Sequence, residues 1–266
     1  MSLSIIVILI FCGAICNVIS AIFGIGGGVL IVPVLKTLFP NYPIQMIAAT
    51  SLTIVMGTAL INLILLRHQH IQINVKNLLF WSVGMIIGVQ LGFQWSFLLP
   101  EKWISLLFIT TLLVLAIKTL IASHNEKKVS PSPKNEYIKG LLICLFGGNI
   151  AGITGIGGGS IMAPLINQLH SVKASQIALY TNAMMVIGGL GNLYGYLSKV
   201  PPHTLHSWQI GYVDFMIVGI MVCSSFVMSF FSMKCRAVLS PAMIKKSLAF
   251  ILLFIAGYMF TISFIG

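Results

Sequence analysis

The stretch GIGGG at residues 24–28 occurs a second time at residues 155–159. Each copy follows an apolar run of helical length and precedes a short apolar run that contains a proline, Pro33 in residues 29–39 and Pro164 in residues 160–169. Four glycines in five positions disfavour a helix, because each gives up about 1 kcal/mol relative to alanine. The sequence therefore predicts a helix break inside hydrophobic sequence at both copies.

A break in hydrocarbon leaves backbone N–H groups unpaired, so irregular backbone at membrane depth is packed in protein or lines a watery cavity. If a new helix starts near Gly27 and near Gly158, its free N–H groups and its positive dipole end point at that cavity. This is the arrangement of an anion site that uses no basic side chain. Discontinuous helices of this kind recur in transporters.

A second interpretation is open, because glycine clusters in membrane helices also serve only to bring two helices close together. Two copies, each with a proline five residues on, favour the cavity-lining break. A nucleotide site is disfavoured, since GIGGG lacks the GxGxxG spacing, a preceding strand and a following acidic residue.

Composition places the chain in a membrane. The 266 residues have a mean hydropathy of +1.04 and only 7% charged residues, which excludes a soluble globular domain. We expect an all-α polytopic membrane protein with about eight full transmembrane helices plus two short broken half-helices, and no cleaved signal peptide. The predicted full spans are residues 3–21, 44–66, 78–99, 104–121, 138–153, 174–197, 210–231 and 244–265.

The two halves align at a constant offset beyond the glycines. Gln45, Thr50 and Gly57 match Gln176, Thr181 and Gly188. This internal duplication predicts a first transmembrane repeat at residues 1–121 and a second at 138–266. Residues 122–137, ASHNEKKVSPSPKNEY, are polar and contain two prolines, which is typical of a solvated linker.

Basic residues predict how the chain is threaded. If both short segments re-enter and leave on the same side, the basic residues divide almost evenly between the two faces. If both cross, Lys36, Lys102 and Lys199 lie on one face and the other twelve Lys and Arg lie on the opposite face. That asymmetry explains the net charge of +11 by the positive-inside rule and gives no reason to expect a nucleic acid partner. It also implies an inverted repeat, with both chain ends outside.

Small polar residues follow each short segment, Thr50 and Ser51 in the first half and Thr181 and Asn182 in the second. Their hydroxyl and amide groups are candidates to contact a bound anion beside the backbone N–H groups. Bonding between membrane helices without any ligand explains them equally well.

Other chemistry is weakly represented. Asp214, near the start of a predicted span, is the only candidate for a carboxylate within the membrane. We interpret it as a boundary residue, so a cation carrier is disfavoured. The histidines at 68, 70, 203 and 206 lie in predicted loops, and the five cysteines form no CxxC pair. Cys12 and Cys16 share a helix face, which suggests a thiol relay or, more simply, two small buried side chains. We expect no metal, no cofactor and no enzymatic activity.

The segments GIGGGVLIVPVL, AATSL at residues 48–52 and GITGIGGGSIMAPLI together resemble the sulfite exporter TauE/SafE family, also called the 4-toluene sulfonate uptake permeases. The resemblance covers nearly the whole chain. It implies an integral membrane protein that transports sulfur-containing anions such as sulfite, sulfoacetate or other organosulfonates.

By position, the resemblance assigns to the site the following residues: Gly24, Gly26, Gly27, Gly28, Pro33, Thr50, Ser51, Gly155, Gly157, Gly158, Gly159, Pro164 and Thr181. The family's usual Thr-Ser pair is Thr181-Asn182 in the second half, which suggests a different contact there.

The resulting hypothesis is a secondary transporter that holds a small sulfur-containing oxyanion at the glycine breaks near the midplane, in a multi-pass protein of the bacterial inner (plasma) membrane. The alternatives are an anion channel and a non-transporting scaffold whose glycines only pack helices. The sequence leaves the anion, the direction of transport, any coupled ion and the choice between monomer and homodimer open.

Overall fold

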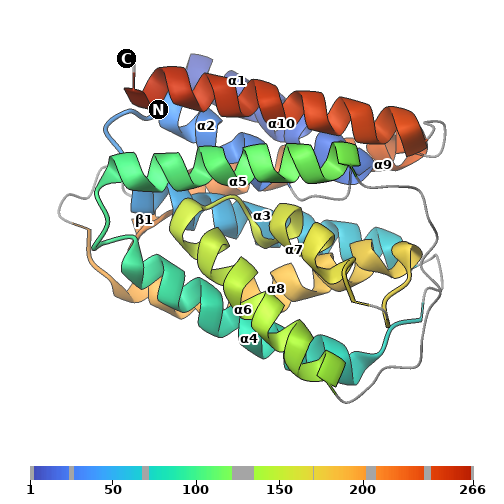
Figure 1. Ribbon diagram of the computed structural model, residues 1–266. Helices are drawn as coiled ribbons and strands as arrows, with labels where there is room; N and C mark the ends of the chain where they lie inside the picture. The colour runs from blue at the N-terminus through green and yellow to red at the C-terminus, as the bar shows by residue number, and fades with distance from the viewer. Residues whose placement is uncertain are drawn as a thin grey trace.

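The computed structural model describes residues 3–23, 27–67, 72–121, 135–169, 171–201, 208–236 and 241–264. Within these ranges the chain forms ten helices and one two-stranded hairpin (Figure 1). The elements are α1 (Leu3–Phe23), α2 (Gly28–Leu38), α3 (Ile44–Leu66), α4 (Val75–Trp95), α5 (Glu101–Ile121), α6 (Asn135–Thr154), α7 (Gly158–Ile166), α8 (Ala174–Ser198), β1 (Gln209–Ile210), β2 (Val213–Asp214), α9 (Phe215–Arg236) and α10 (Pro241–Phe264).

Helix lengths confirm the predicted class. Eight described helices have 20 to 25 residues, whereas α2 has 11 and α7 has 9. At about 1.5 Å per residue the two short helices reach only about half of a 30 Å hydrocarbon layer. Six of the long helices, α1, α3, α4, α5, α6 and α10, are apolar enough to cross a membrane by length and composition. The more polar α8 has Thr181, Asn182 and Asn192 buried inside the bundle.

The bonds between helix ends define two ends of the bundle. Lys36 near the end of α2 pairs with Glu101 at the start of α5 at 2.9 Å and bonds Ser263 near the end of α10 at 3.3 Å. We call this the hairpin end, because β1 and β2 lie there. The opposite end, where α3 and α5 stop and α4 and α6 begin, we call the basic end. From the breaks inside the bundle, α2 runs to the hairpin end and α7 to the basic end, which are the ends expected if both short segments cross.

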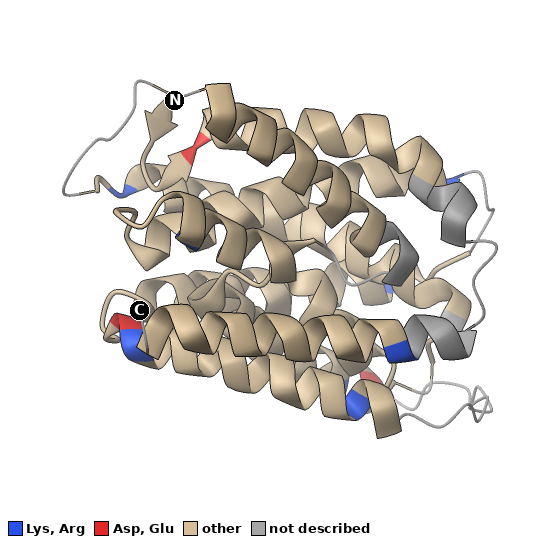
Figure 2. Ribbon diagram, turned by 90° about the horizontal axis from the view of Figure 1, so that it is seen from above, with Lys and Arg blue, Asp and Glu red and all other residues tan. Residues whose placement is uncertain are grey.

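Charges follow this division. Among described residues, Lys36, Lys102 and Lys199 lie at the hairpin end, as the threading predicted. At the basic end lie helix-terminal residues such as Arg67, Lys76, Lys118, Lys139, Lys173 and Lys246. Figure 2 shows charged segments near the two ends of the helices and an almost uncharged middle.

Local capping sets where helices start, and it corrects one predicted span. Asn74 caps α4 by accepting hydrogen bonds from the N–H groups of Lys76 and Asn77. Asp214 Oδ1 does the same for Met216 and Ile217 in α9, at 3.0 and 3.2 Å. The prediction of one span over residues 210–231 is therefore wrong at its start, because the hairpin occupies Gln209–Asp214 and a side-chain cap begins α9 only at Phe215.

The helices pack in matching pairs. If each helix is exchanged for the one five places away in the chain, one packed pair turns into another packed pair. The pair α1 and α9 corresponds to α6 and α4, the pair α3 and α9 to α8 and α4, and the pair α2 and α3 to α7 and α8. The pairs α3 with α8 and α5 with α10 are their own counterparts. Most pairs thus recur when each helix is exchanged for the one five places away, which is the packing that an inverted repeat produces. The residue boundaries of the repeats stay a prediction.

Glycines outside the repeated stretch form a helix-packing seam between α4 and α6. A Cβ at Gly88 or Gly92 would collide with the backbone of α6, and one at Gly148 or Gly152 with the backbone of α4. Small residues at such intervals let membrane helices approach closely. The outer surface is apolar, as in Phe11, Phe250 and Phe254, each about 70% exposed, and this suits contact with lipid rather than water.

Candidate functional site

The second glycine stretch is an unwound segment between α6 and α7. Gly155 and Gly157 have φ angles of +71° and +82°, a region that side-chain-bearing residues rarely occupy. The N–H of Gly155 still bonds Ala151 O at 2.8 Å, and that of Ile156 bonds Thr154 Oγ1 at 3.4 Å. Because Gly157 is the residue before α7, no side chain caps this helix. The predicted break is thus confirmed here, with its glycines buried.

The first stretch is described only in part. Gly24 and Gly26 lie outside the described residues, while Gly27 precedes α2 and Gly28 is its first residue. The carbonyl of Gly27 accepts the N–H groups of Leu30 and Ile31. Again the residue before the short helix is a glycine, so α2 also begins without a side-chain cap.

The two breaks touch each other. A Cβ on Gly28 would collide with the carbonyl of Ile156, and a Cβ on Gly157 would lie 3.5 Å from Cα of Gly28. The helices α2 and α7 also contact each other. Their amino-terminal ends, which carry partial positive charge, therefore converge inside the bundle.

A small cavity lies at the start of α7. Its volume is about 20 Å³, and it is enclosed by side chains of α3, α4 and α8 together with Gly158. Met85 and Tyr196 line it, and a Cβ on Gly158 would fall on the methyl group of Met85. Of the residues that the sequence assigned to the site, Gly158 is the one that lines this cavity.

The polar pair on α3 binds other segments. Ser51 Oγ donates to the carbonyl of Gly155 at 2.8 Å, so it holds the second break against the first half. Thr50 Oγ1 accepts the N–H of Asp214 at 3.2 Å. Both side chains are buried. The structure therefore brings Ser51 to a break and Thr50 to the start of α9.

The polar pair on α8 bonds its own helix. Thr181 Oγ1 donates to the carbonyls of Ile177 and Ala178, and Asn182 Nδ2 donates to that of Ala178 at 2.7 Å. Both side chains are buried. Their role as anion contacts stays a prediction.

Contacts between segments distant in the sequence join the described residues at both ends of the bundle. At the hairpin end, Tyr42 Oη donates to Asp214 Oδ2 at 2.8 Å, and Lys199 Nζ lies 3.9 Å from the centre of the Phe97 ring. At the basic end, Tyr180 Oη accepts the N–H of Asn74 at 2.9 Å. Gln45 and Gln176, aligned in the sequence, each donate to a loop carbonyl, that of Ser96 at the hairpin end and that of Gln72 at the basic end.

The remaining sequence candidates lie farther from the cavity. Pro33 is buried in α2, and Pro164 in α7 lines a groove that faces outward. Cys16 is buried beside Gly27, and Cys12 is half-buried, both with free thiols. The histidines at 68, 70, 203 and 206 lie outside the described residues, and the described side chains form no group of three or more metal ligands.

Sequence reasoning missed several residues near the break. Met85, Met185 and Tyr196 close the cavity but carry no local pattern that distinguishes them from other apolar residues. Thr154 caps the end of α6 with its side chain, and its position directly before the glycines was a usable signal. The pair Gly188-Gly189, which lines the cavity, was another, because two glycines weaken the middle of a helix.

Comparison with known proteins gives a consistent result. Residues 9–259 match the family described as sulfite exporter TauE/SafE. A "Probable membrane transporter protein" of Haemophilus influenzae is 52% identical over 100% of this chain and 99% of its own length. A protein of the same description from Methanocaldococcus jannaschii is 26% identical over 92% of this chain and 91% of its own. No solved structure matches the chain significantly.

Proposed function

The chain belongs to the sulfite exporter TauE/SafE family of membrane transporters, and we propose that it carries small sulfur-containing oxyanions, sulfite or organosulfonates such as sulfoacetate, across the bacterial inner (plasma) membrane. The protein is an integral, multi-pass membrane protein. In the proposal the anion sits at the glycine breaks, near the middle of the membrane.

The observation that carries the proposal is the meeting of two half-helix starts beside a cavity. Gly28 packs on Ile156, and the cavity opens at Gly158. Free N–H groups and a positive dipole end in the first turn of a helix favour an anion without basic side chains. None of the described residues that line the cavity carries a carboxylate, so no negative side chain there repels an anion.

The cavity in this conformation is too small for the ligand. Its volume of about 20 Å³ holds a water molecule, which needs at least about 10–15 Å³, but not a sulfur with three oxygens. Binding therefore requires Met85 or α7 to move. We propose that the two repeats, residues 1–121 and 138–266, rock against each other around the breaks, as inverted repeats do in other carriers.

The membrane potential suffices to drive export of a monoanion. With a negative cytoplasm, moving one charge outward gains about 2.3 kcal/mol per 100 mV. The proposed mechanism is therefore a uniport, with the basic end in the cytoplasm. Uptake against the potential would need a coupled ion.

The test is uptake of labelled sulfite, sulfoacetate and taurine into tight proteoliposomes under an imposed potential of either sign. Saturable flux that follows the sign of the potential and is competed by one anion supports the carrier. Flux without saturation supports a channel instead. No flux of any of these anions through demonstrably folded protein contradicts the proposal and favours the scaffold.

Gly158→Ala separates a ligand site from a packing site. The added methyl would meet only the flexible end of Met85, so the fold should tolerate it while the cavity shrinks. Without a ligand Met85 can move aside, so we expect little change in melting temperature. With the anion bound that space is taken, and an overpacking cost of about 1–3 kcal/mol in the bound state alone would lower anion affinity about 5- to 150-fold. The matched control is Gly219→Ala, because a Cβ there would have no atom within 4 Å. Equal transport by the two variants would count against the site.

A further inference from the structure

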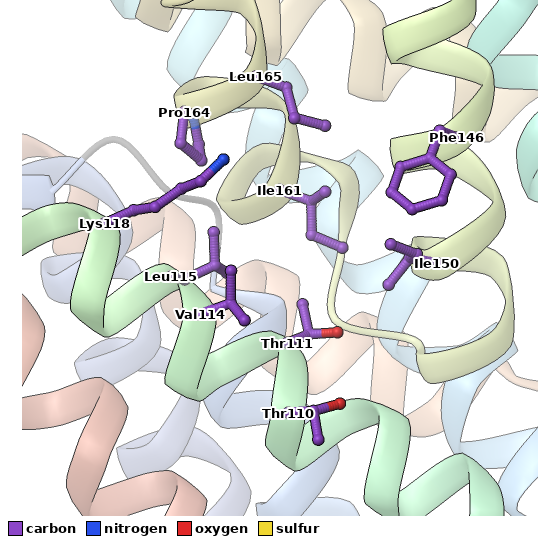
Figure 3. A pocket seen from close by; sticks show the side chains of 10 residues that line it. All are labelled: Thr110, Thr111, Val114, Leu115, Lys118, Phe146, Ile150, Ile161, Pro164 and Leu165. Atoms are coloured by element: carbon purple, nitrogen blue, oxygen red, sulfur yellow. The ribbon is translucent and has the colours of Figure 1, made fainter.

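An outward-facing groove lies between α5, α6 and α7, away from the central cavity. Its volume is about 260 Å³, close to the lower limit of about 300 Å³ for small-molecule pockets. Figure 3 shows its apolar walls, formed by Val114, Leu115, Phe146, Ile150, Ile161 and Leu165. Val114 is 52% exposed and Phe146 63%. The groove is therefore open to the surroundings of the bundle, which are hydrocarbon at this depth.

The groove has a cation at one end. Lys118, in the last turn of α5, lies at the basic end, and Thr110 marks the other limit eight residues earlier. At 1.5 Å per residue the groove follows α5 for about 12 Å from the helix end toward the middle of the bundle. Thr110 and Thr111 donate to the carbonyl of Leu107, so their hydroxyl hydrogens are used within α5. The exposed ammonium group of Lys118 therefore lies at the basic end of an apolar groove.

The charge of Lys118 is not neutralised by a described carboxylate. Among the described side chains, the ion pair within 4 Å joins Lys36 and Glu101. A second lysine, Lys139 on α6, lies two helical turns toward the basic end from Phe146, at a spacing of seven residues that keeps both on one helix face. The basic end of α6 thus carries a further lysine on the helix face that bears Phe146.

The matching region of the other half carries hydrogen bonds between helices. There α2 lies against α10, where the hydroxyls of Thr37 and Tyr258 are hydrogen-bonded at 2.9 Å and Lys36 bonds Ser263. At α5 and α7, contacts of this kind are replaced by the open groove with an unneutralised lysine.

We propose that this groove binds an anionic phospholipid, with an acyl chain along the apolar walls and the phosphate at Lys118. Hydrocarbon followed by a negative group at headgroup depth matches the order of apolar walls and cation along α5. Basic pockets between membrane helices at the cytoplasmic side bind acidic headgroups in this way. Because Ile161, Pro164 and Leu165 belong to α7, the lipid contacts the half-helix that begins at the candidate anion site. An effect on transport rests on the proposed function, whereas binding does not.

The binding experiment uses delipidated, detergent-purified full chain titrated with phosphatidylglycerol or with phosphatidylcholine of identical acyl chains, followed by native mass spectrometry. We expect selective retention of phosphatidylglycerol by the wild type. Lys118→Gln should weaken that retention about fivefold, and Val114→Trp, which fills the groove from an exposed position, should abolish it. Lys246→Gln, on α10 at the same end, is the matched control and should bind as the wild type does.

Equal binding of the two lipids, or unchanged selectivity in Lys118→Gln, would overturn the proposal. So would a stable dimer that Val114→Trp converts to monomers, because the groove would then hold a second copy of the chain. Sulfite flux is measured separately, in vesicles with and without phosphatidylglycerol. Selective lipid binding without any flux would contradict the proposed transport function and leave the lipid site standing.

Discussion

The polar pair on α3 and the polar pair on α8 occupy matching places in the two halves but bond differently. Ser51 and Thr50 reach to the other half, to the Gly155 carbonyl and to the Asp214 N–H. Thr181 and Asn182 bond carbonyls of their own helix. Both halves thus have polar side chains after the short segment. Of these two pairs, the one on α3 bonds to the other half, whereas the bonds of the pair on α8 stay within its own helix.

The starts of α4 and α9 continue the comparison. Each begins with a side-chain cap, Asn74 at the basic end and Asp214 at the hairpin end. The N–H of each capping residue is bound by a hydroxyl from the opposite half, that of Tyr180 for Asn74 and that of Thr50 for Asp214. The second half therefore performs with Tyr180 what the first half performs with Thr50. At the basic end the cap is neutral, while at the hairpin end it is an acid that also accepts the Tyr42 hydroxyl.

Both halves therefore have a glycine break and a helix cap that is held by a hydroxyl of the other half, but different residues make these contacts in each half. Two ends with distinct chemistry can open under distinct conditions, as a carrier with alternating access requires.

The largest effect is expected at the breaks themselves. Gly155→Ala would place a side chain at a φ of +71° and push a methyl into the backbone of Ala48. Left-handed backbone costs about 1–2 kcal/mol for such residues, and overpacking adds about 1–3 kcal/mol. We expect poor expression and a clearly lowered melting temperature. Gly27→Ala, whose methyl would lie 3.3 Å from Cys16, is the control and should lose much less; equal losses would show that the two positions are not distinguished by geometry.

A smaller effect should separate the two polar pairs. Thr50→Val leaves the buried N–H of Asp214 without its acceptor, which costs about 1–3 kcal/mol. Thr181→Val removes only a bond to carbonyls of its own helix, so its stability should be close to wild type. Chemical denaturation in one detergent compares the two variants directly. If Thr181→Val weakens anion binding at unchanged stability, it is a ligand contact; if it destabilises the protein as much as Thr50→Val, the comparison fails.

The smallest effect concerns the hairpin end at alkaline pH. The pKa of Tyr42 is raised above its ordinary value of about 10, first by burial, then by the hydrogen bond to Asp214 and the negative charge of that residue. The neutral phenol is therefore favoured in the folded state. The contribution of Tyr42 to the free energy of unfolding is present below about pH 10 and is lost as the pH rises toward the raised pKa.

Melting temperatures of wild type and Tyr42→Phe between pH 8 and pH 11 check this sign. The wild type should lose stability more steeply above about pH 10, by at most about 1.4 kcal/mol per pH unit for one proton. If the melting temperatures of the two proteins fall in parallel with pH, ionisation of Tyr42 is not the cause of the loss of stability at alkaline pH. Tyr258→Phe, at the exposed bond with Thr37, controls for the removal of a hydroxyl in general.

Much of the fold was predictable because its signals are local. Apolar runs of twenty residues, the solvated lysines between them and glycine-rich breaks each depend on neighbouring residues, and they predicted the long helices, the threading and both half-helices. The start of α9 was mispredicted because residues 210–213 are apolar enough to extend a span, and only the cap at Asp214 and the pairing of Gln209 with Asp214 show otherwise.

The candidate site was predictable only at its glycines. Met85 and Tyr196 look like ordinary core residues in the sequence, and they line the cavity because α4 and α8 pack against the start of α7. Likewise, the glycines of α4 and α6 serve close packing and those of residues 155–159 serve a break, although both are glycines in apolar sequence. The number of glycines per turn distinguishes the two roles. Glycines spaced four residues apart leave a helix intact, whereas four glycines in five residues do not.

The membrane-spanning class, the positions of the helix breaks and the family of this protein could all be predicted from its sequence, because hydropathy, glycine content and motif spacing are properties of adjacent residues. Only the tertiary structure decided that the two breaks touch, that Ser51 binds Gly155, that Tyr42 and Thr50 meet Asp214, and that a groove with Lys118 opens beside α7. These contacts join residues more than one hundred positions apart or depend on how three helices pack. No local pattern specifies which distant surface a helix face will meet.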